Sequence, residues 1–145
     1  MKKSVIAITI ALGIVFIVAA ACGPKTEGDS GVAVGNTIKT VVVGNLNATL
    51  SNSTGQLKQG DQELMLSFTD SAGKPVDVGA VSLNFHMPAM GGMAAMNDAV
   101  TFTTTNSPGV YRGKVNIGMA GEWQGQLAYE GPAGNGKTTF SVTAQ

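Results

Sequence analysis

The sequence is poor in the residues that carry most protein chemistry. Its 145 residues include one cysteine and one histidine, aromatic residues make up 6%, and charged residues make up only 12%. A single cysteine allows no disulfide within the chain and no CxxC metal or redox motif. Nine basic residues balance nine acidic ones and form no basic stripe, so the charge pattern of a nucleic-acid-binding protein is missing. We therefore expect no nucleic-acid partner.

Groups of residues typical of catalysis are missing as well. Nucleophilic catalysis needs a serine or cysteine beside a base, and the one histidine, His86, lies in an apolar segment with no adjacent carboxylate. The glycine-rich run at residues 131–138 lacks the spacing of a phosphate loop and is typical of a hairpin turn. We therefore expect a protein without enzymatic activity.

The start of the chain has the layout of a bacterial export signal. Two lysines precede an apolar run from residue 5 to residue 18, which ends at Ala19-Ala20-Ala21-Cys22. A charged region, an apolar region and a small-residue cleavage site in this order are typical of a signal peptide. Cys22 at the predicted cleavage site resembles the lipobox of bacterial lipoproteins. We predict that residues 1–21 are a lipoprotein signal peptide and that lipidation of Cys22 anchors the exported protein in the cell membrane or outer membrane, facing the periplasm or the exterior.

The rest of the chain divides into a short tether and one domain. Residues 22–36 mix glycine, serine, proline and charged residues, a composition that predicts a flexible, lipid-anchored tether. Residues 37–145 have the length of one ordinary domain and are too few for two.

Short runs of β-branched and apolar residues, separated by turn residues, dominate this domain. Within one run Leu64, Leu66 and Phe68 alternate with polar residues, which is the pattern of a strand with one buried face. The seven predicted strands are residues 38–43, 62–69, 76–87, 100–105, 110–117, 123–130 and 138–143. Their rhythm predicts an all-β, immunoglobulin-like antiparallel β-sandwich. Helix is expected only briefly, around residues 92–98.

Three motifs occur in an order typical of a known family. His86-Met-Pro-Ala-Met-Gly-Gly-Met is followed by Ser107-Pro-Gly-Val-Tyr-Arg-Gly and by Ile117-Gly-Met-Ala-Gly-Glu-Trp. In order and spacing they resemble the MPxM, PGxY and MxGxW segments of the YtkA-like domain family, over about residues 41–142. The resemblance implies an exported immunoglobulin-like domain without catalytic activity, related to domains found beside copper-efflux adaptors and to FixH-type proteins of oxidase maturation. Many relatives place a histidine within or just after the MPxM segment, whereas here His86 precedes it.

Methionine is concentrated in one segment of the chain. Met87, Met90, Met93 and Met96 follow one another at intervals of three residues, directly after His86. Thioether sulfur is a soft, neutral ligand that favours Cu(I) over harder divalent ions. The four methionines, with His86 as an auxiliary ligand, therefore form the predicted copper site. If residues 93–96 were helical, the same spacing would keep their sulfurs on one face.

Two other interpretations of this segment stay open. Methionine is a flexible gap-filler, and Met87 shares strand parity with Leu83 and Phe85, so it is expected to face the core while His86 faces away. The segment would then close the end of the sandwich without metal, or form a contact surface for a partner. Met119 can add a sulfur if residues 117–121 fold towards the same end, although the family motif suggests that it packs in the core.

Together these features predict a non-enzymatic lipoprotein of the cell envelope that holds or transfers Cu(I) through a methionine-rich loop. Its expected partners are the membrane, through Cys22, and a copper-handling or oxidase-assembly membrane protein. The alternative is an interaction domain that docks on a membrane efflux or oxidase-assembly complex and binds no metal.

Overall fold

The computed structural model describes residues 35–145, so the predicted signal peptide, Cys22 and most of the predicted tether lie outside the described residues. Every regular element in the described part is a strand. None of these residues forms a helix of the length and apolarity needed to cross a bilayer.

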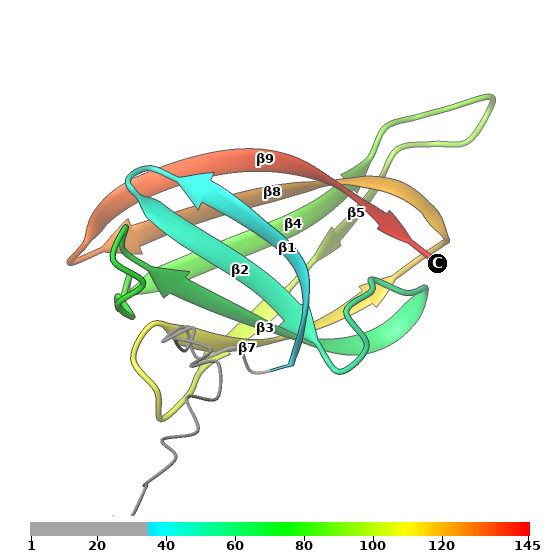
Figure 1. Ribbon diagram of the computed structural model, residues 1–145. Coiled ribbons are helices and arrows are strands. Elements are labelled where there is room, and N and C mark those ends of the chain that lie inside the picture. Colours follow the sequence, from blue (N-terminus) through cyan, green and yellow to red (C-terminus); the bar gives the residue numbers. More distant parts are fainter. Residues whose placement is uncertain (1–34) are drawn as a thin grey trace, which may run out of the picture.

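Two antiparallel sheets form a β-sandwich, as predicted (Figure 1). Along the chain the strands are β1 (Asn36–Val43), β2 (Leu46–Asn52), β3 (Gly60–Thr69), β4 (Ala80–Met87), β5 (Met96–Ala99), β6 (Thr101–Thr104), β7 (Val110–Ile117), β8 (Gly121–Gly131) and β9 (Gly134–Ala144). One sheet has the order β1-β2-β3-β7-β6, and the other has the order β5-β4-β8-β9.

The core lies between the sheets and is built from the alternating side chains of each strand. In β3 the inward residues Leu64, Leu66 and Phe68 are at most 1% exposed. The opposite sheet contributes Phe85 and Trp123, both fully buried. Full burial of a large apolar side chain contributes about 1.5–3 kcal/mol. The apolar residues that alternate along the strands therefore stabilise the fold by packing between the sheets.

Residues 35–145 form nine strands where the sequence predicts seven, and β2 is one of the two that the prediction missed. β1 and β2 are joined by the two-residue turn Gly44-Asn45, with Val43 opposite Leu46. A glycine followed by asparagine between two apolar-alternating runs is a hairpin signature. Leu46, Ala48 and Leu50 face the core at 4% exposure or less, so the signal for β2 was present in the sequence.

β5 is the second unpredicted strand, and it replaces the helix expected around residues 92–98. That expectation was wrong because the backbone of β5 pairs with β4, with Met87 opposite Met96 and Asn84 opposite Ala99. The chain then crosses from one sheet to the other at Val100, whose N–H donates to the Leu83 carbonyl at 2.9 Å. Strands that switch sheets in this way form the corners of sandwiches.

A buried tyrosine ties the loop before β4 to the sandwich. The hydroxyl of Tyr111 donates to Asp77 Oδ1 at 2.9 Å and accepts the backbone N–H of Val78 at 3.2 Å. Its ring meets that of Phe68 edge to face, with centroids 6.0 Å apart. Burial, with the neighbouring Asp77 carboxylate, raises the pKa of Tyr111, whereas hydrogen bonds from the Gly79 N–H and from Tyr111 lower the pKa of Asp77. The PGxY motif therefore closes one end of the fold.

Candidate metal centre

The methionine-rich segment forms a hairpin that projects from the sandwich. β4 and β5 are joined at one end of the domain by residues 88–95, which extend past the body of the sandwich (Figure 1). At the tip Met90 and Met93 exchange backbone hydrogen bonds of 2.8 and 3.2 Å. Gly91 and Gly92 between them have φ of 50° and 89°, a left-handed conformation that glycine adopts without strain. The glycine pair therefore makes the reversal possible.

The hairpin register pairs the four methionines two by two. Met87 lies directly opposite Met96 in the β4–β5 ladder, and Met90 lies opposite Met93 at the tip. Residues directly opposite each other in an antiparallel pair have Cβ atoms about 4.5–5.5 Å apart. The three-residue spacing seen in the sequence therefore arises from a strand reversal, not from a helix face. Two thioether pairs result, one at the base of the hairpin and one at its tip.

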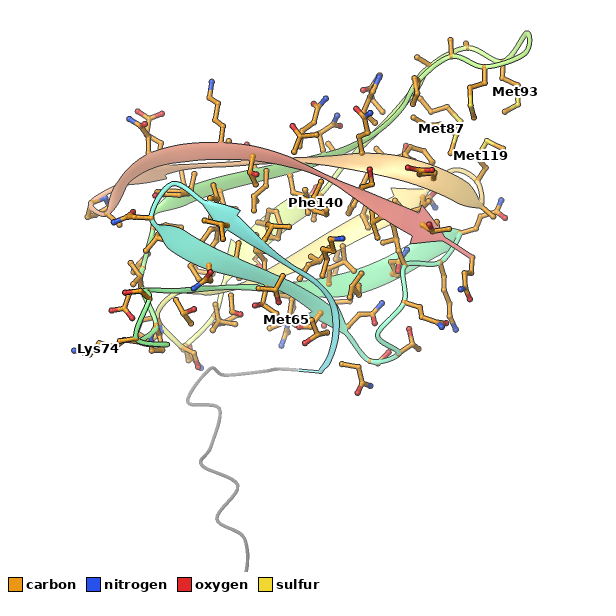
Figure 2. The ribbon with its side chains drawn as sticks, turned by 45° about the horizontal axis from the view of Figure 1, so that its top comes forward. Met65, Lys74, Met87, Met93, Met119 and Phe140 are labelled. Atoms are coloured by element: carbon orange, nitrogen blue, oxygen red, sulfur yellow. The ribbon has the colours of Figure 1, made fainter. Side chains whose placement is uncertain are left out.

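Met87 and Met96, at the base of the hairpin, pack against the core of the sandwich, and a fifth methionine, Met119, packs against the core as well. Met87 is 3% exposed, and Met96 and Met119 are partly buried against the core. A Cβ added to Gly121 would lie 3.0 Å from the Cε of Met87, and one added to Gly118 would overlap the Cε of Met96. Met119 stands between these two glycines in the chain. Figure 2 shows Met87 and Met119 at the same end of the domain.

The turn that carries Met119 is held by hydrogen bonds from three directions. The Gly118 N–H donates to Asp98 Oδ2 of β5 at 2.9 Å, and Gln59 Nε2 donates to the Gly118 carbonyl at 3.1 Å. The indole N–H of Trp123 donates to the Met119 carbonyl at 3.1 Å. Because Trp123 is fully buried, it fixes this turn to the core. The backbone of this turn is therefore held by hydrogen bonds that do not involve any methionine side chain.

The tip pair has a different environment. Met90 is 58% exposed and Met93 is 48% exposed, which makes them two of the large apolar side chains that the described part leaves open to solvent. Met93 lies out on the projecting loop, beyond Met87 and Met119 (Figure 2). The two thioether groups at the tip are therefore accessible from solvent to an ion or a partner protein.

His86 points away from Met87 and Met96, the two methionines at the base of the hairpin. His86 lies opposite Asn97 and is half-buried, and alternation along β4 places it on the face opposite to Met87. Its Nδ1 is 2.9 Å from Asn97 Oδ1, which also accepts from Asn84 Nδ2 at 3.3 Å. The expectation that Met87 faces the core and His86 faces away is confirmed. His86 and Met87 do not meet around one point.

Other possible ligands in the described part do not form a metal cluster. No three His, Cys, Asp or Glu side chains of residues 35–145 are placed to hold an ion together. A surface depression of about 590 Å³ lies over the other sheet, with Gln62, Met65 and Arg112 among its lining residues. None of the five residues of the predicted copper site lines it.

Four of the five methionines at this end, Met87, Met90, Met93 and Met96, were predictable from their even spacing in the sequence, whereas Met119 lies in a separate segment. The signal for Met119 was the MxGxW motif, whose glycine leaves room for the methyl group of Met87.

The comparison with known proteins agrees with the motifs. The sequence model of the YtkA-like family matches residues 40–128, which include the whole hairpin and the turn that carries Met119. No curated protein and no solved structure matches the chain.

Proposed function

The chain belongs to the YtkA-like family, and from this premise we propose that it is a non-enzymatic binding domain that holds or hands on Cu(I) through the methionine hairpin, residues 87–96. One observation carries the proposal. The register of β4 and β5 turns an evenly spaced row of methionines into two facing thioether pairs on one hairpin.

The ligand chemistry fits a monovalent soft ion. Thioether sulfur is soft and uncharged, so it selects Cu(I) over ions that prefer carboxylate oxygen. Methionine carries no proton to lose, so binding releases none and affinity should not depend on mild acidity. The exposed tip pair gives an incoming ion, or a partner that carries one, direct access to sulfur.

Anchoring and partners complete the proposal. A lipid on Cys22 would hold the domain at the outer side of a membrane, with the segment that runs from Cys22 to the start of β1 as the tether. A membrane protein of copper handling or oxidase assembly would then be the expected donor or acceptor of the ion.

The exposed tip also supports a second candidate function. Met90 and Met93 form an apolar surface on a projecting loop, and methionine-rich surfaces adapt readily to partner proteins. In this alternative the hairpin docks on a membrane efflux or oxidase-assembly complex without metal. It predicts that a partner can be crosslinked to the tip in copper-free cells, and that this crosslink is independent of added copper.

The test of copper binding is an anaerobic Cu(I) titration against a chromogenic chelator. Leucine keeps the volume of methionine and removes the sulfur, so the decisive variant replaces Met87, Met90, Met93 and Met96 by leucine. The control is Met65→Leu, because Met65 lies on β3 in the other sheet (Figure 2). Wild-type protein and the control should compete with the chelator, and the quadruple variant should not. Equal competition by all three proteins would end the copper proposal.

A further inference from the structure

We infer that the resident Cu(I) site is made by three sulfurs, those of Met87, Met96 and Met119, the last of which comes from outside the hairpin. This inference rests on the proposed function and specifies its ligands. The tip pair, Met90 and Met93, is then a point of exchange and not the place where the ion is held.

The side chains of Met87 and Met96 converge on the turn that carries Met119. Met87 and Met96 are cross-strand neighbours on the inner face of the hairpin. The methyl group of Met87 lies against Gly121 and that of Met96 against Gly118, and these glycines flank Met119. In methionine the sulfur is one bond from the methyl carbon. Two sulfurs therefore approach the turn from which the third side chain emerges.

The turn that carries Met119 is fixed in place without any metal ion. A binding site is tighter when its supporting atoms are fixed before the ligand arrives. Asp98, Gln59 and Trp123 hold the turn through hydrogen bonds to Gly118 and Met119 backbone atoms. The tip pair lacks such support, since only its own backbone bridge links the two strands there.

The position between these three methionines is shielded by the core on one side and open to the surface on the other. Met87 is 3% exposed, so a neighbouring ion would have one side closed by the core. Met96 and Met119 are only partly buried, so the site stays open to the surface on the other side. An ion held there can still be passed to the exposed sulfurs of Met90 and Met93.

The competing explanation is that the three methionines only fill the end of the core. Leucine substitutions separate the two possibilities, because a volume-conserving apolar exchange keeps the packing and removes only the sulfur. If packing is the whole role, Met119→Leu changes nothing about copper.

The experiment uses the full chain in detergent, with Cu(I) as the probe in anaerobic competition with a chelator. Four proteins are compared: wild type, Met119→Leu, the double variant Met90→Leu with Met93→Leu, and the control Met65→Leu. We expect Met119→Leu to weaken the affinity at least about tenfold, since loss of even a supporting group of a metal site has this effect. The control should stay within about twofold of wild type, as is usual for a distant site. The tip variant should lose less affinity than Met119→Leu, and an equal or larger loss in the tip variant would overturn the inference.

X-ray absorption at the copper edge gives a second readout. Wild-type protein should show three sulfur neighbours and Met119→Leu two, with urea midpoints followed by Trp123 fluorescence to verify that both are folded. Binding by wild type with an affinity that Met119→Leu shares, or with three sulfurs retained in that variant, would overturn the inference and leave copper binding intact. No binding by wild type would overturn the proposed function as well.

Discussion

Replacing Tyr111 by phenylalanine removes one hydroxyl group that joins the loop before β4 to the core. Two hydrogen bonds disappear, the one to Asp77 Oδ1 and the one from the Val78 N–H. The ring remains, so the edge-to-face contact with Phe68 is kept. The substitution therefore isolates the contribution of the hydroxyl group.

The size of the stability loss depends on whether each hydrogen-bond partner of the hydroxyl can find a replacement. Asp77 is exposed, so water replaces its lost donor. Val78 is fully buried, and its N–H has no such replacement. A buried donor left without an acceptor costs about 1–3 kcal/mol, so we expect the free energy of unfolding to fall by about that amount at pH 7.

The same substitution should change the response to alkaline pH. The pKa of Tyr111 is raised above its usual 10.0 in the folded state, chiefly by burial. Its contribution is therefore complete below pH 10.0 and is lost as the pH rises through the folded-state value, because the unfolded chain ionises first. Phenylalanine has no such titration. The stability difference between wild type and variant should narrow as the pH rises above 10.0.

Urea denaturation measures both effects. Trp123 is the only tryptophan of the chain and is fully buried, so its fluorescence reports unfolding directly. Linear extrapolation of the free energy at each pH then gives the difference between the two proteins. A loss below about 0.5 kcal/mol at pH 7, which is the range of neutral surface substitutions, would refute the reasoning. A difference that stays constant into the alkaline range would refute the part that concerns ionisation.

The remaining predictions concern the methionines and can be measured by urea denaturation and by Cu(I) competition with a chelator. Met87→Ala should lower the free energy of unfolding by about 2–5 kcal/mol because it leaves a cavity, whereas Met87→Leu should cost less than about 1.5 kcal/mol. Alanine at both Met90 and Met93 should change it by less than about 0.5 kcal/mol, since both side chains are exposed. Gly118→Ala should displace the methyl group of Met96 and weaken Cu(I) binding, with little effect on the urea midpoint because that side chain is flexible. Cu(I) affinity should be constant between about pH 5.5 and 7.5, because thioethers release no proton; a decrease in acid would show that a ligand other than thioether sulfur takes part.

Much of the fold was predictable because its strands carry their burial pattern locally. Leu83, Phe85 and Met87 alternate with polar residues and all point into the core at 3% exposure or less. β5 was not predictable in this way. It has only four residues, two of them exposed, and it is a strand because β4 lies beside it. A sequence window that contains only β5 cannot show its partner.

The orientation of side chains within the candidate site was predictable from the sequence, but the position of Met119 beside the hairpin was not. Strand parity correctly separated Met87 from His86, because alternation is a local property of β4. The gathering of Met119 with Met87 and Met96 depends on sheet order, since β8 lies next to β4 and the turn before β8 therefore lies at the base of the hairpin. Spacing within residues 87–96 contains no information about that neighbour.

The crossing at Val100 has a mechanical consequence for the hairpin. One arm of the hairpin, β5, continues directly into β6, which is hydrogen-bonded to β7 in the opposite sheet. A ligand that draws Met96 towards the turn at Gly118 therefore pulls on a segment that is fastened to both layers. We therefore expect slower amide hydrogen exchange at Val100 when a ligand is bound at the methionines. The exchange rate at this sheet corner would then report ligand binding.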